Sequence, residues 1–122
     1  MWLTLADRVA DHPFLTTAIL TVLFEVVAAA GRLCCDIRVT RDTKALGLWT
    51  GGWRIHHGYV GMAVALSAVA VPQAIQCLCL SLGGALVLSD LIHHFAVLWP
   101  VTGSPEFHLR YPARSSVDPD VP

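Results

Sequence analysis

Three long apolar stretches, separated by polar segments, dominate the pattern of this chain. The first covers residues 14–30 and is interrupted only by threonines and by Glu25. The second covers residues 55–71 and the third covers residues 74–99, with Pro72 in the short turn between them. About 20 apolar residues in a helix are enough to cross a bilayer, and proline cannot continue a helix. The pattern therefore predicts three transmembrane helices.

The remaining segments are a polar connection and a tail. Residues 31–54 join the first two apolar stretches, and residues 100–122 follow the third. The tail contains several prolines and shows little periodicity, which favours an irregular segment over a helix. We therefore expect an all-α fold, a single membrane domain over residues 1–122, in which three transmembrane helices form a bundle with an irregular C-terminal tail.

Composition supports a membrane location. Hydrophobic residues make up 55% of the chain and charged residues 14%, and the mean hydropathy is +0.60. A soluble domain carries about a quarter charged residues. The net charge is −1, and basic residues do not form a stripe with interleaved aromatic residues, so the sequence excludes nucleic acid as an expected partner. Membrane lipid is the expected surrounding.

The basic residues predict an orientation in the membrane. Seven of the eight lysines and arginines lie in the connection and the tail, at Arg32, Arg38, Arg41, Lys44, Arg54, Arg110 and Arg114. Three crossings place the connection and the tail on the same side of the membrane. The positive-inside rule makes this side cytoplasmic. The sequence therefore predicts an integral membrane protein with its N-terminus outside and its C-terminus in the cytoplasm.

The four cysteines predict free thiols. Cys34 and Cys35 are neighbours, and Cys77 and Cys79 lie within the third apolar stretch. Adjacent cysteines rarely form a disulfide, and two helical residues at i and i+2 point about 200° apart. We expect Cys77 and Cys79 to pack as small apolar side chains.

Three crossings also bring five of the six histidines, and the two acids inside the apolar stretches, to one end of the bundle. These residues are Glu25 near the end of the first stretch, His56 and His57 at the start of the second, Asp90, His93 and His94 toward the end of the third, and His108 in the tail. On a helix, Asp90, His93 and His94 share one face. An ionisable residue inside a membrane is costly unless it is paired, so such a cluster is a candidate functional site.

Histidine and carboxylate side chains together are typical of a transition-metal site. Neutral imidazoles and carboxylates are the ligands that zinc and non-haem iron prefer, and catalytic sites keep one coordination position open. We expect a zinc or iron ion to be held by Asp90, His94 and His57. The further ligands or supporting hydrogen-bond partners are expected to be His56, His93 and His108.

Two nearby residues are predicted to act on the substrate. Glu25 is the expected general base, and Arg54 is expected to hold an anionic headgroup. Because the site would open at the level of the lipid headgroups, a lipid or lipid-linked substrate fits better than a soluble metabolite. The hypothesis is therefore a metal-dependent enzyme, a hydrolase or an oxidase, that acts on a membrane substrate.

Two other functions remain open from the sequence alone. One histidine from each of two helices can ligate haem b, which would make the protein an electron-transfer subunit. The cluster could also belong to a non-enzymatic membrane subunit, in which it carries protons or holds helices together. Small residues at Gly58, Gly61, Ala65 and Ala68 favour close helix contact, so we expect a homo-oligomer or a subunit of a membrane complex in each case.

Overall fold

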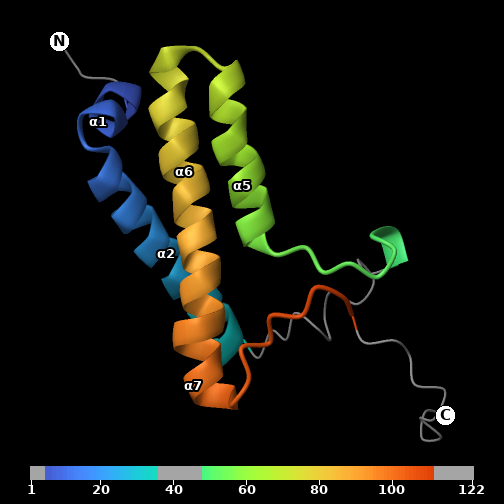
Figure 1. Cartoon of the computed structure of the whole chain (residues 1–122). Helices are drawn as coiled ribbons and strands as arrows, with labels where there is room; N and C mark the ends of the chain where they lie inside the picture. Colours follow the sequence, from blue (N-terminus) through green and yellow to red (C-terminus); the bar gives the residue numbers. More distant parts are fainter. Residues whose placement is uncertain (1–4, 36–47, 112–122) are drawn as a thin grey trace, which may run out of the picture. The chain divides into compact units, whose positions relative to one another are not determined.

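The computed structural model describes residues 5–35 and 48–111, and they belong to two compact units. Unit 1 comprises Met1–Ile37 and Ile55–Phe107, and unit 2 comprises Arg38–Arg54 and His108–Pro122. Half of the predicted basic connection (residues 36–47) and the end of the tail (residues 112–122) lie outside the described residues. Figure 1 shows the whole chain.

Unit 1 is built from helices. They are α1 (Leu5–Asp11), α2 (Pro13–Cys34), α5 (His57–Ser67), the 3-10 helix η1 (Ala68–Ala70), α6 (Gln73–Leu91), the π-helix η2 (Ile92–Leu98) and α7 (Trp99–Thr102). Helices α5 and α6 form an antiparallel hairpin, and α1 and α2 pack against α6 from its other side (Figure 1). The residues that the structure describes contain no β-strand, so the all-α prediction is confirmed for this part of the chain.

Prolines and glycine mark the helix ends of unit 1. Pro13 is the first residue of α2, where its missing N–H costs no hydrogen bond, and Pro72 directly precedes α6. The helix that starts at Gln73 continues without a break through η2 and α7. Gly103 then adopts a left-handed conformation with φ 74° and donates its N–H to Trp99 O at 2.9 Å, which ends α7.

Two helices are long and apolar enough to cross a membrane. They are Pro13–Arg32 and Ile75–Thr102, and they correspond to the first and third predicted spans. The second predicted span is shorter in the structure, because the chain is still extended at His56 and the helix starts only at His57. Helices α5 and η1 contain 11 and 3 residues, or about 21 Å, against about 30 Å of hydrocarbon in a bilayer.

Helices α5 and α6 approach each other through small residues. A Cβ atom placed on Gly61 would lie 2.6 Å from Gly83 O, and one placed on Gly83 would lie 2.6 Å from Ala65 N. Side chains larger than hydrogen therefore have no room at these two positions. The small residues of α5 that were expected to favour close helix contact make that contact with α6 of the same chain.

Unit 1 is polar inside and apolar outside. Its buried polar side chains include Thr21, Ser81 and Ser89, and its buried apolar side chains are Val9, Ala68, Ala85 and Leu98. Large apolar side chains such as Phe14 and Val69 are almost fully exposed. A soluble protein shows the opposite distribution, and large exposed apolar surfaces mark contacts with membranes or partners. This distribution is suited to lipid surroundings.

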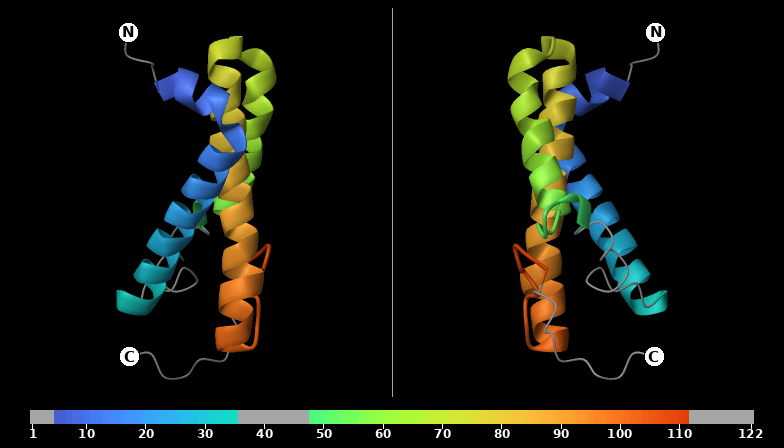
Figure 2. Two further views of the ribbon diagram at one scale, coloured as in Figure 1. Left: turned by 90° about the vertical axis from the view of Figure 1, so that its left-hand side faces the viewer. Right: turned by 90° about the vertical axis from the view of Figure 1, so that its right-hand side faces the viewer.

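Helix α2 is the most exposed of the long helices. Only 6% of its most apolar 18-residue stretch is buried. Its C-terminal half diverges from the long α6–η2–α7 helix (Figure 2). Two polar contacts help to hold this half. Glu25 pairs with His93 of η2, and Arg32 pairs with Glu106, which follows α7. Helix α2 is therefore joined to the rest of unit 1 by ion pairs as well as by packing.

In the described part of unit 2, two short segments pair with each other through residues 52–54 and 109–111, and this pairing is here called the clip. Arg54 N donates to Leu109 O at 3.0 Å, and Tyr111 N donates to Gly52 O at 2.9 Å. Trp53 and Arg110 form an isolated antiparallel bridge, and the Arg110 guanidinium lies 4.6 Å above the Trp53 ring. The clip is thus held by backbone hydrogen bonds and a cation–π contact.

Candidate metal centre

Three buried side chains of unit 1 converge on one point. His56 directly precedes α5, Asp90 lies in α6 and His94 lies in η2. Their side chains are at most 7% exposed. His56 Nδ1 lies 3.1 Å from His94 Nε2, and these two nitrogens lie 3.7 and 3.8 Å from Asp90 Oδ1. These three donors could hold a metal ion.

The spacing of the donors matches a tetrahedral metal site. Zinc binds histidine nitrogen and carboxylate oxygen at about 2.0–2.2 Å, which separates neighbouring tetrahedral ligands by about 3.3–3.6 Å. The observed separations of 3.1, 3.7 and 3.8 Å lie on both sides of this range. A metal ion would therefore require shifts of only a few tenths of an ångström, and it would have one coordination position left for water or substrate.

A backbone carbonyl determines which ring nitrogen of neutral His94 carries the proton. Its Nδ1 lies 2.6 Å from Pro105 O. A carbonyl oxygen can only accept a hydrogen bond, so the proton of the neutral imidazole is on Nδ1 and the lone pair is on Nε2. That lone pair belongs to the nitrogen nearest His56 and Asp90. Metal-binding histidines usually donate their other ring N–H to such an acceptor.

The carboxylate of Asp90 lacks a hydrogen bond at one oxygen. Oδ1 is buried and has no hydrogen bond of good geometry, although His57 Nδ1 lies 3.1 Å and His56 Nδ1 3.7 Å away. A buried carboxylate oxygen without a donor costs free energy, and a cation at this position would offset that cost. Space around Asp90 is tight, because a Cβ on Gly58 would lie 2.7 Å from Asp90 Oδ2.

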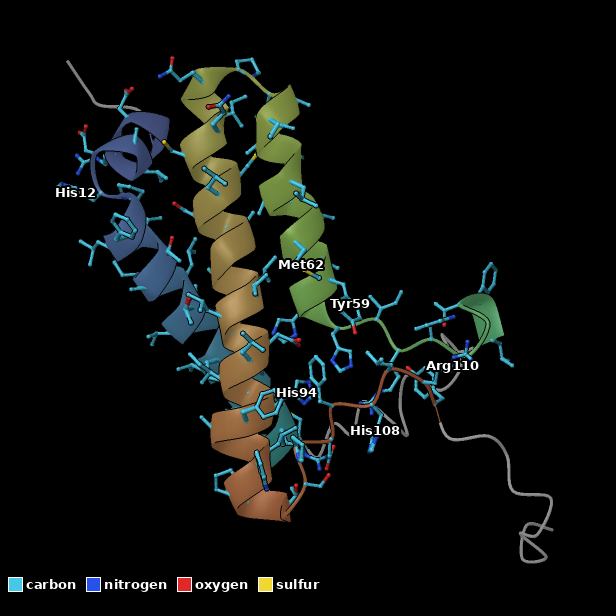
Figure 3. The ribbon with its side chains drawn as sticks, viewed as in Figure 1. His12, Tyr59, Met62, His94, His108 and Arg110 are labelled. Carbon is cyan, nitrogen blue, oxygen red and sulfur yellow. The ribbon has the colours of Figure 1, made fainter. Side chains whose placement is uncertain are left out.

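The centre lies where α6 changes into a π-helix. Trp99 N donates to His94 O, five residues earlier, which widens the helix at η2. Such π-helical turns occur often at functional sites. His94 points from this helix toward the end of α5 that carries Tyr59 (Figure 3), and the Tyr59 ring meets His56 edge-on at 5.5 Å.

His93 and Glu25 form a separate pair beside the centre. His93 Nδ1 lies 3.0 Å from Glu25 Oε1, and Ser89 Oγ donates to Glu25 Oε2 at 3.4 Å. Both ionisable side chains are largely buried, with 14% and 15% exposed. Asp90, His93 and His94 were expected on one face. The structure directs His93 to α2, while Asp90 and His94 meet His56.

The structure places the predicted site residues in three groups. His56, Asp90 and His94 form the donor group, with His57 in contact with Asp90. Glu25 and His93 form the adjacent pair. Arg54 and His108 belong to unit 2, so their expected roles at the centre stay predictions.

Two residues at the centre were given no role from the sequence. Pro105 contributes its carbonyl, and the Phe107 ring stacks on His56, with centroids 4.6 Å apart, and meets His94 edge-on at 5.1 Å. Both follow Gly103, at the point where the chain turns back after α7. No residue-type signal marks a backbone carbonyl as a hydrogen-bond acceptor for a histidine, so only the tertiary contact identifies it.

Comparisons with known proteins give no relative for this chain: no family model matches it, and no curated protein or solved structure shows a significant match.

Proposed function

We propose that this protein is a membrane-embedded metalloprotein in which His56, Asp90 and His94 bind a zinc or ferrous ion. One observation carries the proposal: two imidazole nitrogens and one carboxylate oxygen, from the start of α5 and from the continuous helix α6–η2, lie 3.1–3.8 Å apart in a buried position. The hydrogen bond from His94 Nδ1 to Pro105 O adds support, because it directs the lone pair of His94 toward the other two donors.

The proposed function is enzymatic. A site with three protein ligands and one open position is typical of catalytic zinc and non-haem iron. The Glu25–His93 pair next to this site is the candidate acid–base group, and Arg54 is the candidate ligand of an anionic headgroup. The substrate we propose is a lipid or a lipid-linked molecule, since the side chains around the centre are carried by apolar helices.

The alternative haem site fits the geometry less well. Two axial histidines must lie on opposite faces of a macrocycle, whereas His56 Nδ1 and His94 Nε2 are only 3.1 Å apart. Phe107 also stacks against His56, which fills space that a macrocycle would need. The Glu25–His93 pair joins α2 to η2, which favours a helix-packing role for this pair but does not account for the convergence of His56, Asp90 and His94.

Metal analysis of the purified protein tests the proposal. The protein is expressed with a histidine-free tag, purified in detergent, and compared with the variants His56→Ala, His94→Ala and His12→Ala. We expect about one equivalent of zinc or iron in the wild type and a large loss in the two ligand variants. His12 lies before α2, outside the donor group, so its variant is the control and should retain the metal.

Two outcomes of the metal analysis would contradict the proposed metal centre. A wild-type protein that takes up neither zinc nor iron after reconstitution contradicts the metal centre. Equal metal loss in His12→Ala and His94→Ala would show that the metal does not report on this cluster. An absorption spectrum is recorded on the same sample, because a Soret band would support haem instead.

Lipid conversion tests the enzymatic part separately. Wild type and Asp90→Asn are reconstituted with metal in vesicles of mixed membrane lipids, and the lipids are compared by mass spectrometry. Hydrolysis adds water to a substrate and oxidation adds oxygen or removes hydrogen, so the mass change distinguishes the two. A product that forms equally with Asp90→Asn, which lacks the carboxylate ligand, contradicts catalysis at this centre.

A further inference from the structure

The segment Gly103–Phe107, here called the strap, follows a defined path after α7. Gly103 reverses the chain with φ 74°. The hydroxyl of Thr102 donates to Ser104 O at 2.8 Å, and Glu106 N donates to Ser104 Oγ at 3.3 Å. These local bonds organise the strap.

The strap contacts two of the three candidate ligands. The carbonyl of Pro105 accepts the hydrogen bond from His94 Nδ1 at 2.6 Å. The ring of Phe107 stacks on His56 at an interplanar angle of 29° and a centroid distance of 4.6 Å, and it also meets His94 edge-on. Both imidazoles are therefore oriented by residues that do not themselves offer a metal donor here.

A strained residue links these two contacts to α2. Glu106, between Pro105 and Phe107, has φ 48°, a left-handed conformation that is unfavourable for residues other than glycine. Its carboxylate Oε1 lies 3.2 Å from Arg32 NH2 near the end of α2. Strain of this kind persists only when surrounding contacts hold it. The Arg32 ion pair and the Phe107 stacking are two contacts that help to offset it.

We propose that the strap is a positioning element of the metal centre, latched to α2 by the Arg32–Glu106 ion pair, so that strap closure and metal binding reinforce each other. This inference rests on the proposed metal site. Pro105 and Phe107 hold His94 and His56 in the orientation that the metal needs, as partners outside the ligand set do in other metal sites. By linkage, metal bound to these histidines must in turn stabilise the closed strap.

Cobalt titration tests the positioning role, because tetrahedral Co²⁺ has a visible spectrum that depends on ligand geometry. Co²⁺ affinity and spectrum are measured for the wild type, Phe107→Ala and the exposed control Phe14→Ala. We expect Phe107→Ala to weaken binding roughly 10–100-fold and to alter the spectrum. We expect Phe14→Ala to match the wild type. Wild-type affinity and spectrum in Phe107→Ala would overturn the proposal.

The latch is tested by exchanging its charges. Arg32→Glu and Glu106→Arg should each weaken Co²⁺ binding, and the double variant with both changes should recover most of the affinity. Arg8→Ala, at an exposed arginine of α1, is the control for loss of a positive charge. If both single variants are folded by circular dichroism and the double variant does not recover Co²⁺ affinity, the latch is contradicted.

Hydrogen exchange gives a readout that does not require a variant of the strap. Addition of Zn²⁺ should slow amide exchange in residues 103–107 of the wild type and should leave exchange in His94→Ala unchanged. Unchanged exchange in the wild type while Zn²⁺ binds stoichiometrically would overturn the coupling and leave the metal site intact. Failure of the wild type to bind Zn²⁺ or Co²⁺ would instead contradict the proposed function itself.

Discussion

Asp90 is held in place by contacts that a single added methyl group would disturb. Its side chain is surrounded by His56, His57 and His94, and the opposite oxygen, Oδ2, faces the Cα of Gly58. Glycine at position 58 is therefore needed for space, since its backbone is helical and does not require positive φ.

Gly58→Ala should weaken metal binding without unfolding the helices. The added Cβ would lie 2.7 Å from Asp90 Oδ2, so the carboxylate must leave its present position relative to the two imidazoles. Alanine favours a helix over glycine by about 1 kcal/mol, so α5 itself should not be weakened. Metal affinity is measured against Gly84→Ala, whose Cβ would make only an ordinary contact at 3.6 Å with Thr17. Equal affinity in the two variants would argue against a role for Asp90.

At the level of elements, polar contacts and close backbone packing together determine how the helices of unit 1 meet. The α5–α6 hairpin depends on Gly61 and Gly83, where the two backbones come together. Helix α2 depends on the Glu25–His93 and Arg32–Glu106 pairs. In lipid, where burial of apolar surface no longer drives association, small-residue packing and interhelical hydrogen bonds supply the remaining attraction.

Gly83→Ala should separate α5 from α6 and lower stability. A Cβ at this position would lie 2.6 Å from both Ala65 N and Gly61 O, and backbone atoms cannot move aside as a flexible side chain can. Overpacking of this kind costs about 1–3 kcal/mol. Thermal unfolding in detergent measures the loss, with Gly84→Ala on the same helix as the control. A midpoint for Gly83→Ala at or above that of the control contradicts the close approach.

At the level of the whole molecule, the exposed apolar surface supports a membrane protein, while the number of crossings depends on α5. Two helices reach the required length, and α5 with η1 is too short to cross an undeformed bilayer alone. Its small residues already contact α6, so they do not offer a surface for a second copy. The predicted oligomer would have to use other faces, such as the exposed apolar side chains of α2.

Cysteine labelling tests the predicted orientation. Cys34 and Cys35 at the end of α2 are exposed free thiols, and Cys77→Ala with Cys79→Ala removes the other two. In intact cells, an impermeant maleimide should label this protein only after the membrane is opened, since the connection is predicted to be cytoplasmic. Asp11→Cys, in a chain with all four native cysteines replaced, should be labelled without opening. Labelling of Cys34 and Cys35 in intact cells would reverse the orientation.

The apolar pattern predicted the long helices α2 and α6 and which helix ends adjoin, but it did not predict α1. Prolines at positions 13 and 72 mark helix starts, and a chain that folds back between α5 and α6 must bring His56 to the same end as Asp90 and His94. These features depend on short-range chemistry and connectivity, which can be read without coordinates.

Only the tertiary structure showed which of the adjacent histidines lies in the donor group. His57 was expected to bind the metal with Asp90 and His94, and His56 to be a further ligand or supporting partner. His56 precedes the helix in an extended conformation with ψ 144° and meets His94, while His57 contacts Asp90 from the first turn of α5. His93 turns to Glu25 of α2. Periodicity limits a side chain to one face of a helix, but neighbouring residues point about 100° apart. The choice between two neighbours therefore depends on where the helix begins and on what packs against it.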